Sequence, residues 1–173
     1  NRNVIINGDF RVNQAGNKTG KTAEEKRFAG DRWTLNVSSL GTWSGGTEAD
    51  APTGSGFRNS GFLNCTGAAS SPGSSAYCQL QQRFEGQDLQ LIRKGTSSAK
   101  PVTLSFWVKS PKTGIHICEL YDGDNSRHCS QSYTIGTANT WEYKSLTFPA
   151  DTTGAFDDDN ALSLYVTWWL SAG

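Results

Sequence analysis

The chain has 173 residues, which is enough for one domain with a full hydrophobic core. Its 16 Lys and Arg residues are balanced by 16 Asp and Glu residues, and this balance disfavours nucleic-acid binding, which usually needs a basic excess. No apolar stretch reaches the length of a membrane span, so we expect no membrane insertion. The sequence contains no Met, and we therefore expect a processed product or one domain of a longer protein.

The first half of the chain alternates short predicted strands with polar or glycine-rich loops. Residues 4–12 predict a strand that is interrupted at an Asn-Gly pair, and residues 31–37 alternate as a second strand does. The glycine-rich stretch 41–61 predicts a loop around a short segment at 42–44. Further strands are predicted at 61–65 and 77–84.

The second half of the chain contains the strongest strand patterns. In residues 101–109 and again in residues 160–170, apolar side chains occupy every second position. Residues 87–93 are the only segment with helical spacing, and they lie between two glycines. Other strands are predicted at 114–121, 127–135 and 141–148. Because each strongly alternating strand must bury one face, we expect six core residues: Leu104, Phe106, Val108, Leu162, Leu164 and Val166.

Many strands joined by turns, without alternation of helices and strands, predict an all-β sandwich or barrel with at most one short helix. No internal repeat or linker divides the sequence. We therefore expect residues 1–173 to form a single β-sandwich domain.

The four cysteines have two interpretations. A turn at Gly123-Asp124 would place Cys118 opposite Cys129 on a hairpin, within disulfide range. Cys65 and Cys78 bracket a loop rich in small residues and could close it in the same way. The alternative is four small buried thiols. A zinc site is disfavoured, because no Cys-x-x-Cys spacing occurs.

The order of several motifs resembles known families. Residues 4–10, Val-Ile-Ile-Asn-Gly-Asp-Phe, followed by Asp-Arg-Trp at 31–33, resemble the opening of galactose-binding-like jelly-roll domains, including many carbohydrate-binding modules. The later motifs follow one another as in tail-fibre and related virion proteins of tailed bacteriophages. These motifs are Gln82–Gly86, Val102–Ser110, Thr113-Gly114, Tyr133–Ile135, Asn139–Glu142 and Phe148–Gly154.

This resemblance implies a two-sheet antiparallel jelly roll with a non-enzymatic role on the outer surface of a virion, in the tail or a fibre. It implies a homo-oligomer, which would be a trimer on a fibre. It also implies a structural calcium ion near the first strand, with Asp9 as the carboxylate placed to help; no other cofactor is expected. Fold similarity alone does not give a sugar-binding residue set.

Exposed aromatic rings beside short polar side chains are typical of carbohydrate-binding surfaces, because a pyranose face stacks on a ring. Our candidate rings are Trp43, in the glycine-rich segment, and Tyr165 and Trp169, on the non-core side of the last strand. Asp159 and Asn160 are the neighbouring hydrogen-bond partners. The partner would be a host-surface glycan. The alternatives are that these rings belong to the core, or that the chain is a structural module that packs on other virion proteins as a fibre adaptor or head decoration.

Catalysis finds little support in the sequence. His116 and His128 are the only histidines, and neither belongs to a nucleophile motif. A glycosidase needs only two carboxylates at a set distance, and Glu85 and Glu142 are isolated residues that could serve. We rank this hydrolase interpretation last and expect the protein not to be an enzyme.

Overall fold

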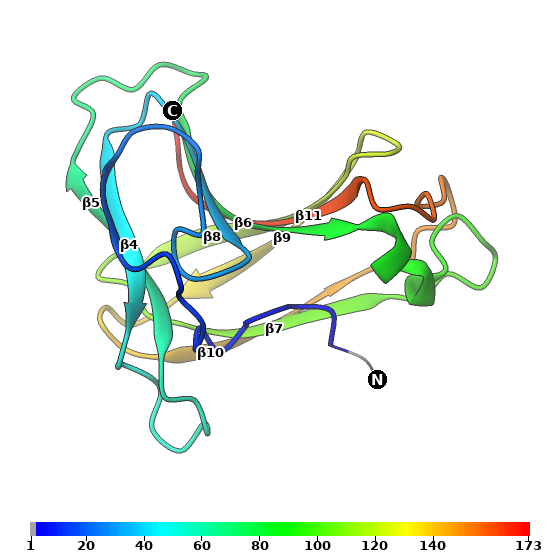
Figure 1. Cartoon of the computed structure of the whole chain (residues 1–173), viewed down its shortest axis with the longest axis horizontal. Helices are drawn as coiled ribbons and strands as arrows, with labels where there is room; N and C mark the ends of the chain where they lie inside the picture. Colours follow the sequence, from blue (N-terminus) through cyan, green and yellow to red (C-terminus); the bar gives the residue numbers. More distant parts are fainter. Residues whose placement is uncertain (1–2) are drawn as a thin grey trace. The chain divides into compact units, whose positions relative to one another are not determined.

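The computed structural model describes residues 3–173, and its regular structure is almost entirely β-strand (Figure 1). The strands are β1 (Lys18–Lys21), β2 (Glu25–Lys26), β3 (Trp33–Ser38), β4 (Thr42–Glu48), β5 (Ser60–Gly67), β6 (Tyr77–Glu85), β7 (Val102–Val108), β8 (Gly114–Asp122), β9 (Arg127–Ile135), β10 (Glu142–Phe148) and β11 (Leu162–Ala172). Two short 3-10 turns, η1 (Gly86–Asp88) and η2 (Gln90–Ile92), stand where one short helix was expected. The all-β, antiparallel, sandwich-like fold predicted from the sequence is confirmed. Among the described residues, no helix is long and apolar enough to cross a membrane.

The described chain contains two compact units. Unit 1 comprises residues up to 82 together with 169–173, and unit 2 comprises residues 83–168. Strands β6 and β11 each contribute residues to both units. Compact units can belong to one folding domain, so the expectation of a single domain stays a prediction.

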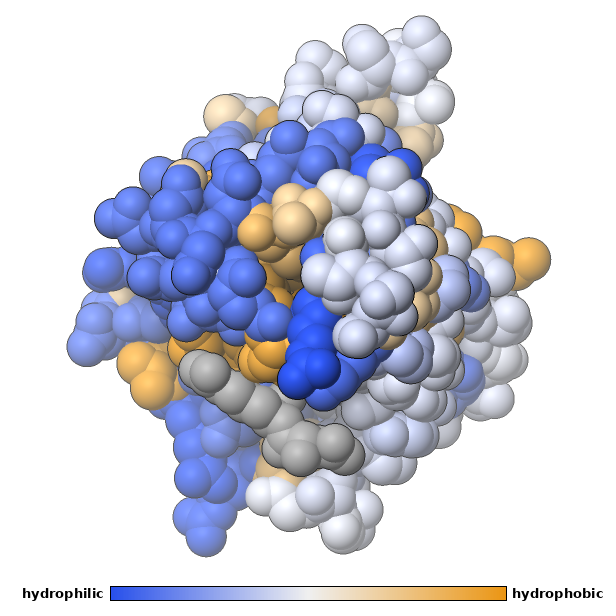
Figure 2. Space-filling view, turned by 90° about the vertical axis from the view of Figure 1, so that its right-hand side faces the viewer, coloured by the Kyte–Doolittle hydropathy of each residue, from blue (hydrophilic) through white to orange (hydrophobic). Residues whose placement is uncertain are grey.

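Unit 1 packs two layers of strands against each other. The first layer has the order β1-β4-β5, and the second contains β3 between β2 and β6. A buried cluster from the second layer and its flanking loops packs against Trp43 of β4 and Leu63 of β5. The buried members of this cluster are Phe28, Leu35, Val37, Leu40, Ala76 and Cys78. Figure 2 shows one face of the molecule, on which hydrophilic residues predominate and hydrophobic residues occupy smaller areas.

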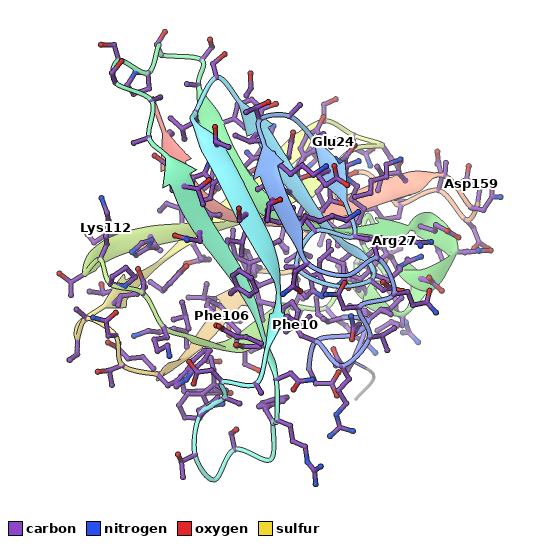
Figure 3. All side chains as sticks on the ribbon, turned by 60° about the vertical axis from the view of Figure 1, so that its left-hand side comes forward. Phe10, Glu24, Arg27, Phe106, Lys112 and Asp159 are labelled. Carbon is purple, nitrogen blue, oxygen red and sulfur yellow. The ribbon has the colours of Figure 1, made fainter. Side chains whose placement is uncertain are left out.

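The glycine-rich segment after residue 41 is a strand rather than the predicted loop. Gly45 in β4 is opposite Leu63 of β5, and a Cβ added at Gly45 would lie 2.2 Å from the ring of Phe28. Gly61 in β5 faces the ring of Phe10 in the same way, at 2.4 Å (Phe10 is labelled in Figure 3). These glycines are therefore places where aromatic rings approach the sheet closely.

Residues 4–12 do not form the predicted strand. Asn7 has a left-handed backbone, with φ of 52°, and its side chain bonds the backbone of Val12 in both directions. The Gln82 side chain accepts a hydrogen bond from the N–H of Ile6 and donates one to the Ile6 carbonyl, each at 2.8 Å. The side-chain amides of Asn7 and Gln82 thus form the backbone hydrogen bonds that a neighbouring strand would have formed.

Unit 2 places the two-stranded sheet β7–β10 against strands β8, β9 and β11. Strands β7 and β10 pair in register along their whole length, from Val102 opposite Phe148 to Val108 opposite Glu142. The ring of Phe106 meets those of Tyr133 and Trp168 in a T-shaped arrangement, at centroid distances of 5.1 and 5.6 Å. In β7 the predicted facing is confirmed: Leu104 is buried, Phe106 and Val108 are half-buried, and the residues between them are exposed. In β11 Leu164 and Val166 are buried and Leu162 is half-buried as predicted, but Ser163 and Thr167 on the other side are buried as well, at 0% and 1% exposure.

The β8–β9 hairpin has a different register from the predicted one. Its connection has four residues, 123–126, because Asp122 pairs with Arg127. The Asp122 carboxylate accepts a hydrogen bond from the Asn125 N–H at 3.1 Å, which holds this longer turn. Cys118 therefore lies opposite Gln131, and not opposite Cys129, so the geometry on which that disulfide was predicted is wrong.

All four thiols are free in the structure. Cys78 and Cys118 are buried, as the alternative interpretation expected, whereas Cys65 is exposed on β5. Burial raises the pKa of the Cys78 thiol to about 12, and the nearby Cys65 adds to this effect. A disulfide between Cys65 and Cys78 stays a prediction.

Candidate functional site

A chain of ring contacts crosses the non-core face of unit 2. The guanidinium of Arg83 on β6 lies 5.4 Å from the ring centroid of Tyr165 on β11. The Tyr165 ring lies 5.3 Å from that of Tyr121 on β8, and Tyr121 stacks on His128 of β9 at 4.4 Å. These four residues, one from each of four strands, are called the aromatic row below.

Strand alternation explains why these side chains share a face. Tyr165 lies between Leu164 and Val166, so its side chain projects to the opposite side of β11 from theirs, the side it shares with the small buried residues Ser163 and Thr167. Tyr121 and His128 are directly opposite each other in the β8–β9 register. Directly opposite residues of an antiparallel pair bring their side chains together on one face, and this pairing produces the stacked contact.

The row carries polar groups that can bind hydroxyls. His128 Nδ1 lies 3.3 Å from Glu119 Oε1. The His128 side chain is 60% exposed and that of Glu119 is 16% exposed, so the imidazole is the part open to a ligand. Tyr121 and Tyr165 are half-buried, with their hydroxyl groups as further hydrogen-bond partners. The arrangement offers ring surface, a cation and a carboxylate side by side.

Of the predicted site residues, only Tyr165 belongs to the aromatic row. Trp169 belongs to unit 1, where its ring meets Tyr77 edge to face with centroids 6.4 Å apart. Trp43 lies in β4, where its indole N–H donates to the Leu40 carbonyl at 2.7 Å and its ring packs against the buried cluster. The structure therefore gives Trp43 a packing role, which agrees with the alternative that the ring belongs to the core.

Asp159 and Asn160 lie exposed in the loop before β11 (Asp159 is labelled in Figure 3). The Asp159 carboxylate accepts a hydrogen bond from the Ala161 N–H at 2.9 Å, and its backbone carbonyl accepts one from the Gln87 N–H at 2.9 Å. These bonds shape the loop. A role of Asp159 and Asn160 in ligand binding stays a prediction.

Asp9, the carboxylate predicted to help hold calcium, forms an ion pair with Arg11. Asp9 Oδ2 lies 3.0 Å from Arg11 Nε. Within residues 3–173, no group of three or more His, Cys, Asp or Glu side chains is arranged to hold a metal ion. The structural calcium implied by the resemblance stays a prediction.

The residues considered for catalysis are used in local contacts. His116 stacks on Tyr133 in the core, whereas His128 belongs to the aromatic row, so the two histidines lie on opposite faces of the hairpin. Glu85 accepts a hydrogen bond from the Gln87 side chain at 2.9 Å. Glu142 forms an ion pair with Lys144 and accepts hydrogen bonds from the N–H groups of Gly136 and Thr137, and these contacts lower its pKa.

A second concave feature of unit 2 is a cavity of about 260 Å³ between its two layers of strands. Its apolar wall comes from strands β7 to β11, from η2 and from the loop that follows β10. The apolar residues that line it are Ile92, Val102, Leu120, Cys129, Phe148, Pro149, Ala150, Phe156 and Leu164. Apolar pockets with a few convergent polar groups are the usual form of small-molecule sites.

A network of charged side chains also lines this cavity. Lys94 Nζ lies 2.6 Å from Asp122 Oδ2 and 3.3 Å from Asp151 Oδ2, and it donates to the Thr153 carbonyl at 2.9 Å. The Lys94 and Asp122 side chains are 9% and 5% exposed. Arg127 binds both oxygens of Asp151, at 2.9 and 3.1 Å, and with the hydrogen bonds from Thr153 and Lys94 it holds the pKa of that carboxyl at about 2.

Sequence reasoning missed Tyr121, His128 and Lys94. The turn predicted at Gly123-Asp124 has two residues and would not place Tyr121 opposite His128, whereas the observed four-residue turn pairs them. Lys94 lies in a polar loop after η2, and lysines in such loops are common and are usually exposed to solvent. The pairing of Tyr121 with His128 depends on the length of the β8–β9 turn, and a correct turn length would have predicted it. No local sequence pattern distinguishes Lys94.

Comparison with known proteins gives one similar structure. No protein-family model and no curated protein matches the chain. The structure is similar to the enzymatically active domain of tailspike protein 4 of bacteriophage CBA120, with 20% sequence identity and a TM-score of 0.49. The match covers 82% of this chain and 17% of that chain, so the similarity involves only a small part of that chain.

One expectation is corrected by this comparison. The sequence analysis expected the protein not to be an enzyme, and the similar domain is described as enzymatically active, which contradicts that expectation. We therefore withdraw it. A similarity of this size carries no argument for a particular reaction, and the galactose-binding-like family stays a prediction.

Proposed function

We propose that this chain is a tail-associated module of a bacteriophage virion that binds host-surface carbohydrate through the aromatic row. The observation that carries the proposal is the continuous contact of Arg83, Tyr165, Tyr121 and His128 across four strands. The order of the motifs along the chain, which resembles tail-fibre and related virion proteins, supports the place on the virion.

The row has the chemistry that recognises sugars. The apolar face of a pyranose stacks on an aromatic ring, and the polar tip of a tyrosine can bond a hydroxyl at the same time. His128 and Glu119 add a donor and an acceptor beside the ring of Tyr121. A row across several strands is long enough to meet more than one sugar unit of a chain.

Binding at such an open surface should be weak for each site. Several copies in one homo-oligomer, such as a trimer on a fibre, would raise the overall affinity through effective concentration. The chain has a formal net charge of +0, so salt should change the affinity only mildly.

The test is adsorption of the full chain to host cells and to a glycan array. Tyr121→Ala should abolish adsorption, and a thermal melt shows that the variant is still folded at the assay temperature. Tyr121→Phe, which keeps the ring, should retain the fold and most of the adsorption. Tyr143→Ala is the matched control, because Tyr143 is a tyrosine of β10 that is 56% exposed and lies outside the row. Equal adsorption by Tyr121→Ala and the unmodified chain would refute the site. Release of reducing sugar, measured in the same samples, separates binding alone from hydrolysis.

A second candidate function is a structural module that packs on other virion subunits. It is favoured by the pair Trp107 and Tyr143, which face each other across β7 and β10 with ring centroids 5.5 Å apart and are 36% and 56% exposed. Exposed aromatic pairs are common at protein interfaces. If this candidate is right, Trp107→Ala will change the oligomeric state without changing adsorption to glycan.

A further inference from the structure

The cavity of unit 2 has an apolar interior that the glycan proposal does not use. Val102 and Phe148 line it from the β7–β10 sheet, and Leu120 and Leu164 line it from β8 and β11. Such a wall favours an apolar ligand body, because polar groups would lose their hydration without gaining hydrogen bonds.

The charges at this cavity do not balance. Three cations, Lys94, Lys100 and Arg127, line it together with two carboxylates, Asp122 and Asp151. Both carboxylates are already paired, Asp122 with Lys94 and Asp151 with Arg127 and Lys94.

Lys100 is the cation that remains. It is exposed, it directly precedes β7, and among residues 3–173 no carboxylate forms an ion pair with it. His128 also lines the cavity, but its imidazole faces Glu119. The cavity therefore presents one uncompensated positive charge beside an apolar space.

We propose that this cavity is a binding site for a small amphipathic carboxylate, with the apolar body between the two sheets and the carboxylate group against Lys100. The site goes beyond the glycan surface and does not depend on it.

The size of the cavity limits the ligand. An apolar cavity of about 150 Å³ holds benzene, which has six carbon atoms. By the same ratio, a cavity of about 260 Å³ holds roughly ten non-hydrogen atoms. Octanoate, with eight carbons and two oxygens, has this size and the proposed chemistry.

The experiment is a titration of the full chain by isothermal calorimetry and by NMR, with octanoate as the probe. 1-Octanol has nearly the same apolar body without charge, octylamine has the opposite charge, and glucuronate has the carboxylate on a polar body. We expect octanoate to bind most tightly, octanol to bind several-fold more weakly, and octylamine and glucuronate to show no saturable binding.

Two variants locate the site. Lys100→Gln should weaken octanoate binding by about three- to fivefold, the size of an exposed charge interaction, and leave octanol binding unchanged. Val102→Phe should fill the cavity and block both ligands, because Val102 lies on the core-facing side of β7. Lys112→Gln is the control, since Lys112 is an exposed lysine between β7 and β8 outside the cavity (Figure 3).

A thermal melt of each variant shows whether it is folded. If Val102→Phe does not fold, NMR shifts in the unmodified chain still locate the ligand, because we expect them to be confined to the residues that line the cavity. The proposal is overturned if octanoate does not bind, if octylamine or glucuronate binds as well as octanoate, or if Lys100→Gln binds octanoate like the unmodified chain.

Discussion

Replacement of Lys94 by Met should be among the most destabilising single substitutions in unit 2. Met keeps the length and the apolar stem of the side chain but removes the ammonium group. The change leaves the Asp122 carboxylate, which is 5% exposed, without its cationic partner at 2.6 Å. It also removes the donor to the Thr153 carbonyl.

The magnitude follows from what remains around Asp122. Breaking a buried ion pair by removing one partner costs about 3–5 kcal/mol, because a buried charge is left uncompensated. Asp122 keeps hydrogen bonds from the N–H and the side-chain amide of Asn125, at 3.1 and 3.0 Å. These bonds offset part of the loss, so we expect a decrease of about 3 kcal/mol in the free energy of unfolding.

Urea unfolding followed by tryptophan fluorescence measures this quantity. The double variant Lys94→Met with Asp122→Asn removes both charges and should recover part of the loss. Lys112→Met, at an exposed lysine, should change stability by no more than about 0.5 kcal/mol. A loss below about 1 kcal/mol for Lys94→Met would show that the network contributes little and that the reasoning from burial is wrong.

Three further predictions concern packing and pH. Phe106→Ala should cost about 3 kcal/mol, at the low end for a core phenylalanine because the ring is half-buried, and a thermal shift no larger than that of a surface variant would contradict it. Gly45→Ala should cost about 1–3 kcal/mol by chemical denaturation, because its Cβ would meet the ring of Phe28 at 2.2 Å, whereas Gly73→Ala, with nothing within 4 Å, should be nearly neutral. The pKa of Asp151 is depressed to about 2 from 3.8, so its contribution to stability should be present above pH 4 and be lost as the pH falls through 2. A series of unfolding midpoints that does not change between pH 4 and pH 2 would refute this assignment.

The strands were predictable where burial of one face is the only reason for the alternation of apolar and polar residues. In β7 and β11 every second side chain is apolar, and the structure buries or half-buries Leu104 and Leu164 on that side. Prediction failed where the same pattern of residues can also arise from side-chain hydrogen bonds to the backbone or from close packing of aromatic rings. Residues 4–12 alternate like a strand, yet the Asn7 and Gln82 side chains satisfy their backbone, and the glycines of β4 mark ring packing rather than a loop.

The sequence by itself determined the all-β class of this protein, the positions of its strong strands and the buried side of β7, because these depend on residues two apart in the chain. It also placed Tyr165 on the non-core face. Only the tertiary structure decided what lies beside that ring, because Arg83, Tyr121 and His128 come from three other strands whose register depends on the length of one turn. The cavity and its uncompensated charge were likewise decided in three dimensions, since the ion pairs around Lys94 join segments that local sequence patterns do not connect.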